Sequence, residues 1–178
     1  SEIDHANINL GLYPMVFVND TPYLVGAPVG VDTSMRIIQL TTDFKNQEKV
    51  YDFEIVGKRT INSGFLSIGD TLYVVNVNDL NDEQIVPRIL QLWIINKDGQ
   101  LLETKNLNEN REGSYAYEIL NFNGNVLIVG MSFFYDRLGT FLSLIYLDRE
   151  GNEIWNFDGE EELADASTIS RAAILSDS

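Results

Sequence analysis

The sequence contains no cysteine and a single histidine, His5. Several classes of functional site depend on these two side chains. Without cysteine there are no disulfides, thiolate metal sites or thiol nucleophiles. One histidine excludes a metal site built from several histidines, and it leaves histidine acid–base catalysis a single candidate near the N-terminus. No apolar run approaches the roughly 20 residues of a membrane-spanning helix, so no membrane span is predicted.

Positive charge is also scarce. Lysine and arginine number 12 against 27 aspartates and glutamates, which gives a net charge of −15. Such a charge repels the phosphates of nucleic acids and anionic lipids, because both bind through a basic surface that releases counterions. We therefore predict no nucleic-acid partner. The 44% of hydrophobic residues and the length of 178 residues suit one globular domain with a sizeable core.

A pattern of strands and tight turns repeats along the chain. Two-residue turns between antiparallel strands are predicted at 19–20, 69–70 and 123–124, because asparagine, aspartate and glycine tolerate the positive φ angles of such turns. A further turn in each of the last two repeats carries Gly99 and Gly151 at matching places. The turns recur at a nearly constant spacing of roughly 50 residues, which indicates a repeat architecture.

Each repeat divides into four segments rich in Val, Ile, Leu, Phe and Tyr, which we interpret as β-strands A to D. Four antiparallel strands in such a period are typical of a β-propeller blade. The sequence therefore predicts an all-β, β-propeller-like fold with about three four-stranded antiparallel blades plus the first strand of a fourth. The alternative is a coincidence of hairpins in an ordinary β-sandwich. The predicted single domain spans 1–178, with blades at about 13–57, 59–108 and 114–158 and the extra strand at 168–175.

Three blades do not close a normal propeller ring, which has about four to eight. Three explanations are open: the sequence is part of a longer protein, copies of the chain assemble into a ring, or the sheets stack in an open arrangement. The sequence ends in the middle of a predicted hairpin, which favours the first explanation. Further propeller blades, of the same or a longer chain, are therefore predicted partners.

The stretch LDREGNEIW at 147–155 resembles the hairpin of quinoprotein-type (PQQ-like) β-propeller repeats and the related repeats of bacterial cell-surface propellers. In those repeats an aspartate and a turn glycine precede a tryptophan that docks against the neighbouring blade. The resemblance implies that Asp148, Gly151 and Trp155 are blade-docking residues, with Gly99 as the matching glycine one repeat earlier. It also implies a bacterial, extracytoplasmic protein that is periplasmic, cell-surface or secreted. It implies little about activity, because such repeats occur in proteins of unrelated function.

The two tryptophans are predicted to be core residues. Trp93 lies in a run of aliphatic residues. Trp155 has a ring large enough to bridge two sheets that pack about 10 Å apart. The alternative for both is a platform on which a sugar ring stacks.

The connection between the second and third strands of the middle repeat is acidic. Asp79, Asp82 and Glu83 lie within five residues of one another. Oxygen-rich clusters suit calcium, which takes six to eight oxygen ligands, but the spacing does not match an EF-hand loop. We therefore favour a solvated acidic loop, with calcium as the one cofactor that the sequence leaves open.

The corresponding connection of the third repeat, 131–139, is predicted to be a loop with a partner-binding site. It carries three aromatic residues in succession, followed by an acid and a base, and neighbouring side chains of an extended chain point in opposite directions. At least one ring should therefore reach the surface, where aromatic residues beside an arginine are typical of protein and carbohydrate interfaces. The alternative is a loop that folds over the blade and buries the rings. The site residues are Phe133, Phe134, Tyr135, Asp136 and Arg137.

These observations favour a non-catalytic binding or scaffolding module, not an enzyme, that meets another protein through the face formed by the connections between strands B and C. No catalytic residue is singled out. The first alternative is part of a carboxylate-dependent carbohydrate-active propeller enzyme, since glycoside hydrolysis needs only two carboxylates. The second is a lectin-like sugar-binding propeller, but its connections should then repeat the same residues, and here they differ.

Overall fold

The computed structural model describes residues 8–9, 15–28, 34–54, 59–79, 88–107, 113–134 and 137–162, and this part of the chain consists of β-strands joined by turns, without a helix. The strands are β1 (Ile8–Asn9), β2 (Val16–Val18), β3 (Thr21–Pro28), β4 (Ser34–Leu40), β5 (Gln47–Glu54), β6 (Arg59–Ile68), β7 (Thr71–Asp79), β8 (Arg88–Asn96), β9 (Leu101–Asn106), β10 (Gly113–Phe122), β11 (Asn125–Phe134), β12 (Arg137–Leu147) and β13 (Glu153–Glu162).

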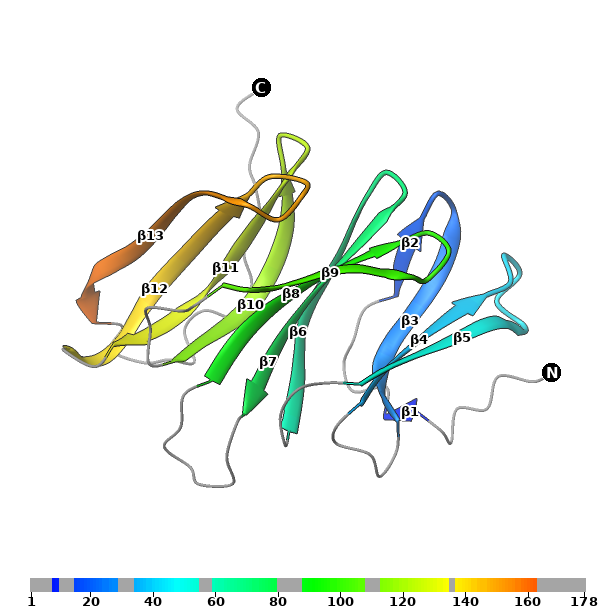
Figure 1. The fold of residues 1–178 in the computed structure, drawn as a ribbon, viewed down its shortest axis with the longest axis horizontal. Helices are drawn as coiled ribbons and strands as arrows, with labels where there is room; N and C mark the ends of the chain where they lie inside the picture. Colours follow the sequence, from blue (N-terminus) through cyan, green and yellow to red (C-terminus); the bar gives the residue numbers. More distant parts are fainter. Residues whose placement is uncertain are drawn as a thin grey trace.

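The strands form three antiparallel sheets that follow one another along the chain and lie side by side (Figure 1). The first sheet is β2-β3-β4-β5 with the short β1 added beside β3, the second is β6-β7-β8-β9, and the third is β10-β11-β12-β13. This architecture confirms the predicted all-β, β-propeller-like class of three four-stranded blades. The strand predicted at 168–175 lies outside the described residues.

The central strands of the second sheet are apolar at consecutive positions because this sheet is packed on both faces. In β8, Trp93 and Ile95 belong to a core shared with the first sheet, whereas Leu92 and Ile94 belong to a core shared with the third. Alternation of side chains along a strand therefore sends neighbouring residues into two different cores. Trp93 is 2% exposed and meets Phe53 of the first sheet edge to face, with ring centroids 5.7 Å apart.

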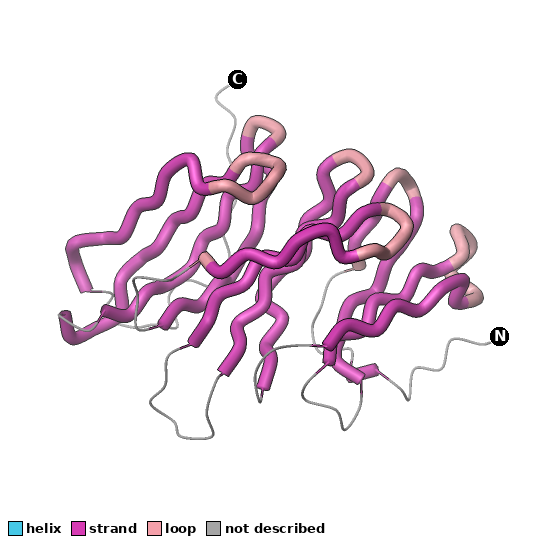
Figure 2. The backbone as a smooth tube through the Cα atoms, viewed as in Figure 1, coloured by secondary structure: helices cyan, strands magenta, loops and turns pink. Residues whose placement is uncertain are grey.

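The turns within the sheets gather at one end of the molecule, the upper end in Figure 2, and the strands leave for the B–C and D–A connections at the other. The three predicted two-residue turns are present, and their backbones adopt positive φ, as at Asn19, Gly69 and Asn123. We call these two ends the turn end and the connection end. Most of the residues of the connections themselves lie outside the described part.

The prediction of a loop over 131–139 is wrong. β11 runs through Phe134 and β12 begins at Arg137, and these two residues are Cα partners across the ladder. Residues that favour β-structure extend the pairing, because each added pair satisfies backbone groups that a loop would leave to solvent. The same holds for Asn76 to Asp79, which belong to β7 and not to the acidic connection.

Candidate functional site

The contacts between neighbouring sheets repeat at the turn end. The hydroxyl of Tyr23 donates a hydrogen bond to the carbonyl oxygen of Lys97, and the hydroxyl of Tyr73 donates one to the carbonyl oxygen of Arg149, each at 2.9 Å. Both tyrosines lie in the second strand of a sheet, and both acceptors lie in the last turn of the next sheet. The sequence repeat therefore carries a repeated contact between blades.

Burial raises the pKa of both Tyr23 and Tyr73 above the ordinary value of 10.0. The folded chain then holds these phenolic protons at a pH where the unfolded chain has begun to release them. The stability that they contribute is fully present below about pH 10 and is lost as the pH rises through the folded pKa values. We expect the double variant Tyr23→Phe, Tyr73→Phe to be less stable by about 1 kcal/mol per lost hydrogen bond at pH 7.

The same variant should show a shallower decline of stability above pH 10, because the two phenols no longer ionise on unfolding. Urea denaturation at a series of pH values measures both effects. An unchanged alkaline slope would show that these two hydroxyls do not link stability to pH.

Polar side chains are buried toward the connection end. Asn76, Ser114, Ser132 and Ser143 are all buried, and their side-chain oxygen and nitrogen atoms have no hydrogen-bond partner among the described residues. Asn76 pairs in register with Gln91 on the neighbouring strand. In the second and third sheets, buried polar groups therefore lie among the apolar side chains toward the connection end, where they are able to hydrogen-bond a polar ligand or the loops that hold one.

Glu118 is the one carboxylate on the described residues of the innermost strands, β2, β6 and β10. It is half-buried and lies at a β-bulge, where the register of β10 with β11 shifts between Ala116 and Glu118. Bulges re-aim side chains and recur beside functional sites. Glu118 is not among the residues predicted from the sequence, although a lone charge within the otherwise largely apolar and aromatic stretch YAYEILNF was the available signal.

The described members of the predicted partner-binding group lie at the connection end. Phe133 is half-buried and meets Tyr115 of β10 edge to face, with centroids 5.8 Å apart. Phe134 ends β11 and Arg137 begins β12. Tyr135 and Asp136 lie outside the described residues, and partner binding by this group stays a prediction.

The predicted calcium ligands fall largely outside the described part. Asp79 is the last residue of β7, and Asp82 and Glu83 are not described. Within the described ranges, no group of three or more acidic or histidine side chains is arranged to hold a metal ion. No described helix is long and apolar enough to cross a membrane.

The residues predicted to dock blades lie in the turns and in β13. Asp148 closes its own turn: its carboxylate accepts hydrogen bonds from the backbone nitrogen of Asn152 at 2.7 Å and from the side-chain nitrogen at 2.9 Å. Gly99 and Gly151 lie against the preceding sheet, and side-chain Cβ atoms added there would crowd Tyr51 and Ile94 respectively. Trp155 is 40% exposed, so the described residues do not bury it as a core side chain.

No protein-family model matches the sequence, and the search of curated proteins finds no match. Among solved structures, an exo-β-1,3-galactanase from Phanerochaete chrysosporium with galactose aligns with a TM-score of 0.52 at 11% identity, over 79% of this chain and 33% of that one. An exo-1,5-α-L-arabinanase from a bovine ruminal metagenomic library aligns with a TM-score of 0.50 at 12% identity, over 88% of this chain and 59% of that one.

These neighbours are β-propeller glycosidases, so the chain has a β-propeller fold and spans between a third and three fifths of their length. The prediction that the chain is not an enzyme is contradicted, because the structures that share its fold are glycosidases. The propeller part of the sequence resemblance is confirmed. The comparisons give no support to a quinoprotein-type identity.

Proposed function

We propose that this chain forms part of a carbohydrate-active β-propeller enzyme of the glycoside hydrolase type. The observation that carries the proposal is the combination of a propeller fold shared with two glycosidases and a connection end underlain by buried polar side chains. Sugars bind through many hydrogen bonds to hydroxyl groups, and side chains such as Asn76 and Ser132 suit that chemistry. Polymeric sugars do not cross membranes, so the proposal includes an extracytoplasmic location.

Glu118 is the carboxylate that we assign to this site. Glycoside hydrolysis uses two carboxyl groups, one that protonates the leaving oxygen and one that acts as base or nucleophile. Glu118 supplies one of them from an innermost strand, where propeller blades converge, and β6 and β10 pack against each other there. The second carboxylate then comes from another part of the propeller.

The test, made on the complete propeller protein that contains this chain, is the release of reducing sugar from β-1,3-galactan and α-1,5-arabinan, together with calorimetric binding of the corresponding oligosaccharides. We expect Glu118→Gln to lower hydrolysis by about 100-fold or more, the usual effect of removing an acid–base group, without a loss of thermal stability. Glu103→Gln on the outermost strand β9 is the matched control, because Glu103 is exposed and far from the innermost strands in the sheet order. Absence of both hydrolysis and sugar binding in the complete protein with Glu118 intact would refute the proposal.

A further inference from the structure

The last turns of the second and third sheets cover matching positions of the sheet before them. Gly151 of the third sheet lies over Leu92, Ile94 and Lys105 of the second, and a Cβ there would stand 3.0 to 3.2 Å from their side chains. Gly99 of the second sheet lies over the ring of Tyr51 of the first in the same way. Both glycines adopt the left-handed conformation, with φ of 76° and 75°, and lack the Cβ that would prevent this close approach.

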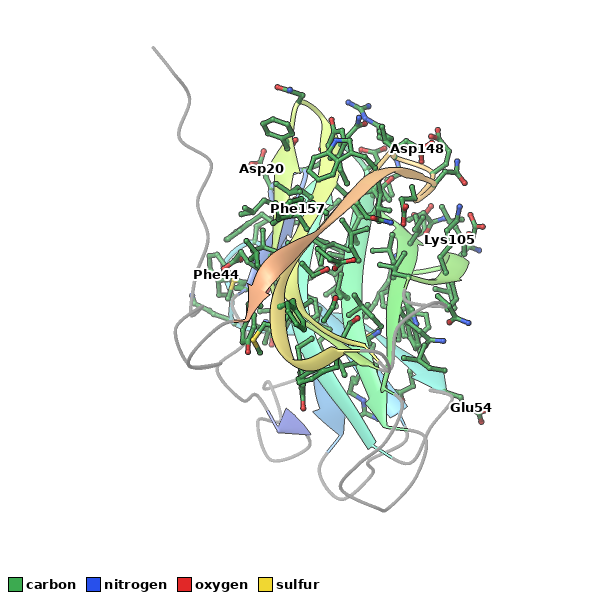
Figure 3. The ribbon with its side chains drawn as sticks, turned by 90° about the vertical axis from the view of Figure 1, so that its left-hand side faces the viewer. Asp20, Phe44, Glu54, Lys105, Asp148 and Phe157 are labelled. Atoms are coloured by element: carbon green, nitrogen blue, oxygen red, sulfur yellow. The ribbon has the colours of Figure 1, made fainter. Side chains whose placement is uncertain are left out.

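The third sheet presents the same positions without a cover among the described residues. Phe157 pairs with Leu144 as Lys105 pairs with Leu92, so Leu144, Tyr146 and Phe157 stand where the second sheet meets a glycine turn. Phe157 is 47% exposed, and Figure 3 looks onto the side of β13 where it lies. We call Tyr146, Trp155 and Phe157 the aromatic face.

Two of the three rings of the aromatic face contact each other. The rings of Tyr146 and Trp155 are tilted by 36° with centroids 5.4 Å apart, and Phe122 meets Tyr146 edge to face at 5.6 Å. In the second sheet, Leu102 and Glu103 stand where the third has Ile154 and Trp155, and they line a cleft of about 420 Å³ against the Arg149 turn. The aromatic face is therefore the third copy of a surface that is twice covered by a following blade.

The first sheet differs from the other two in its last turn, between β4 and β5, which is the turn that would cover a neighbouring sheet. Phe44 donates its backbone nitrogen to the carbonyl oxygen of Thr41 at 2.8 Å, as Gly99 does to Asn96 and Gly151 to Asp148. Its φ is 60°, so a phenylalanine occupies the left-handed position that is glycine in the other two sheets. In the contact that Gly99 makes, a Cβ would overlap the ring of Tyr51 beneath it. The larger side chain of phenylalanine would collide with that ring still more.

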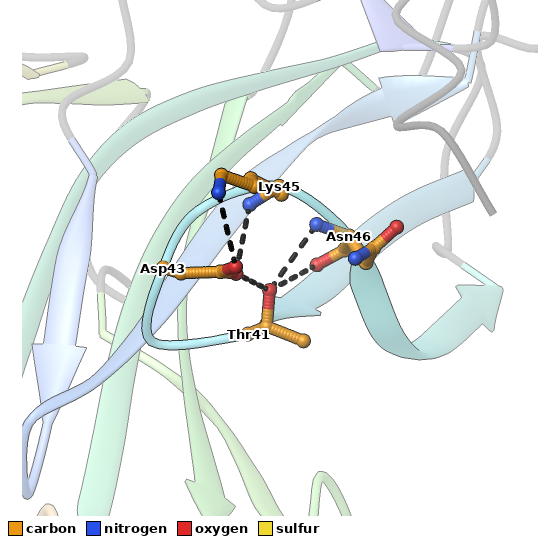
Figure 4. Close-up of polar contacts among 4 residues, drawn as sticks. All are labelled: Thr41, Asp43, Lys45 and Asn46. Atoms are coloured by element: carbon orange, nitrogen blue, oxygen red, sulfur yellow. Dashed lines mark hydrogen bonds and ion pairs between the residues drawn. The ribbon is translucent and has the colours of Figure 1, made fainter.

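The turn that carries Phe44 is held in place by polar contacts (Figure 4). The hydroxyl of Thr41 donates to the carboxylate of Asp43 at 2.6 Å, and the same carboxylate accepts the backbone nitrogen of Lys45 at 3.2 Å. These hydrogen bonds lower the pKa of Asp43 below its ordinary value. The ring of Phe44 meets Phe17 of β2 edge to face at 6.2 Å, so it caps its own sheet.

We propose that the aromatic face binds one further four-stranded β-blade whose last turn places a glycine at the left-handed position. The first sheet of another copy of this chain is not that blade, because Phe44 stands at the glycine position. The blade that carries this glycine adds onto the third sheet. The contact also differs in one detail from the two already made, since Leu127 stands where Tyr23 and Tyr73 donate their hydrogen bonds.

The test is a variant whose first sheet can bind the aromatic face of another copy of the chain. Phe44→Gly combined with deletion of Lys45 gives a turn of the same length as the other two, and glycine relieves the left-handed backbone of its side chain. We expect the unmodified chain to stay at 20.1 kDa in sedimentation equilibrium. The variant should self-associate head to tail at least about tenfold more tightly, a factor that corresponds to about 1.4 kcal/mol.

Adding Phe157→Asp to the variant should return the association to that of the unmodified chain. Asn156→Asp is the matched control, because it adds the same charge to β13 at a position whose partner, Ile145, belongs to the core on the other side of the sheet. In a Trp93→Phe background, acrylamide quenching of Trp155 gives a second readout, and the ring should become protected as the variant associates.

Three outcomes would overturn the proposal. A folded variant that stays monomeric, with Trp155 unprotected, would show that the aromatic face does not accept a glycine turn. Association of the unmodified chain through Phe157 would make a second copy the occupant. Binding of galactan or arabinan that is lost in Phe157→Asp, without protein association, would make the face a sugar platform.

Discussion

Replacing Gly130 by alanine is expected to lower the free energy of unfolding by about 3 kcal/mol, which would remove a large part of the stability of a typical domain. Gly130 of β11 faces Ala116 of β10 beside the bulge. A Cβ at Gly130 would overlap the carbonyl oxygen of Tyr115 and stand 3.1 Å from the Cα of Ala116. Both are backbone atoms of a paired strand, so relief requires the ladder itself to shift.

Gly159→Ala is the control for this prediction. Gly159 lies in β13 of the same sheet, but its nearest atoms belong to Leu142 and lie at 3.6 Å, which is an ordinary van der Waals distance. The free energy of unfolding should stay unchanged or rise slightly in this variant, because alanine reduces the conformational freedom of the unfolded chain. Thermal and urea unfolding compare the two variants. Equal stabilities would mean that β10 and β11 relax around the added methyl group and that the bulge is not rigid.

Trp93→Ala is expected to cost about 3–5 kcal/mol, the usual loss for a buried large aromatic residue. Trp93 is 2% exposed in the core between the first and second sheets, and Phe53 and Ile37 belong to the same core or pack against it. Its removal leaves a cavity bounded by two sheets, which cannot both move in to fill it. The first two sheets should therefore no longer unfold together in a single cooperative transition.

Trp155→Ala supplies the comparison, since it removes the same atoms from an exposed site. Trp155 is 40% exposed, and its ring contacts Tyr146 within its own sheet. We expect a loss of about 1 kcal/mol in this chain, the size of an aromatic pair. Guanidinium denaturation of both variants measures the difference. A loss as large for Trp155 as for Trp93 would mean that another part of the chain already covers the aromatic face.

The repeats predicted the fold because their signals are local. Turn residues such as Asn123 and Gly124, together with the strand residues on either side of the turn, specify a hairpin within about ten positions of the chain. The same reasoning failed at 131–139, where a run of aromatic residues is consistent with either loop or strand. Pairing of Phe134 with Arg137 decides for strand, and pairing depends on a partner strand that the local sequence does not show.

The candidate site was harder to predict, because its members come together only across sheets. Asn76 and Ser132 are unremarkable polar residues in the sequence, separated by more than a whole repeat, and only the packing of sheets buries both toward one end. Glu118 becomes notable when β10 is seen to be an innermost strand with a bulge at that residue. Hydrogen-bonding ladders, not local preferences, determine which strand of a repeat is innermost.

The sequence by itself determined the all-β class, the four-strand period and the left-handed glycines of the turns, since each depends on the conformational limits of single residues and their neighbours. The tertiary structure alone decided which faces of the sheets are covered. It buried Trp93 and left Trp155 exposed, although the sequence predicted both to be core residues. The reason is that burial is a property of the neighbouring sheet: the second sheet has one on either side, and among the described residues the third has a neighbour on one side only.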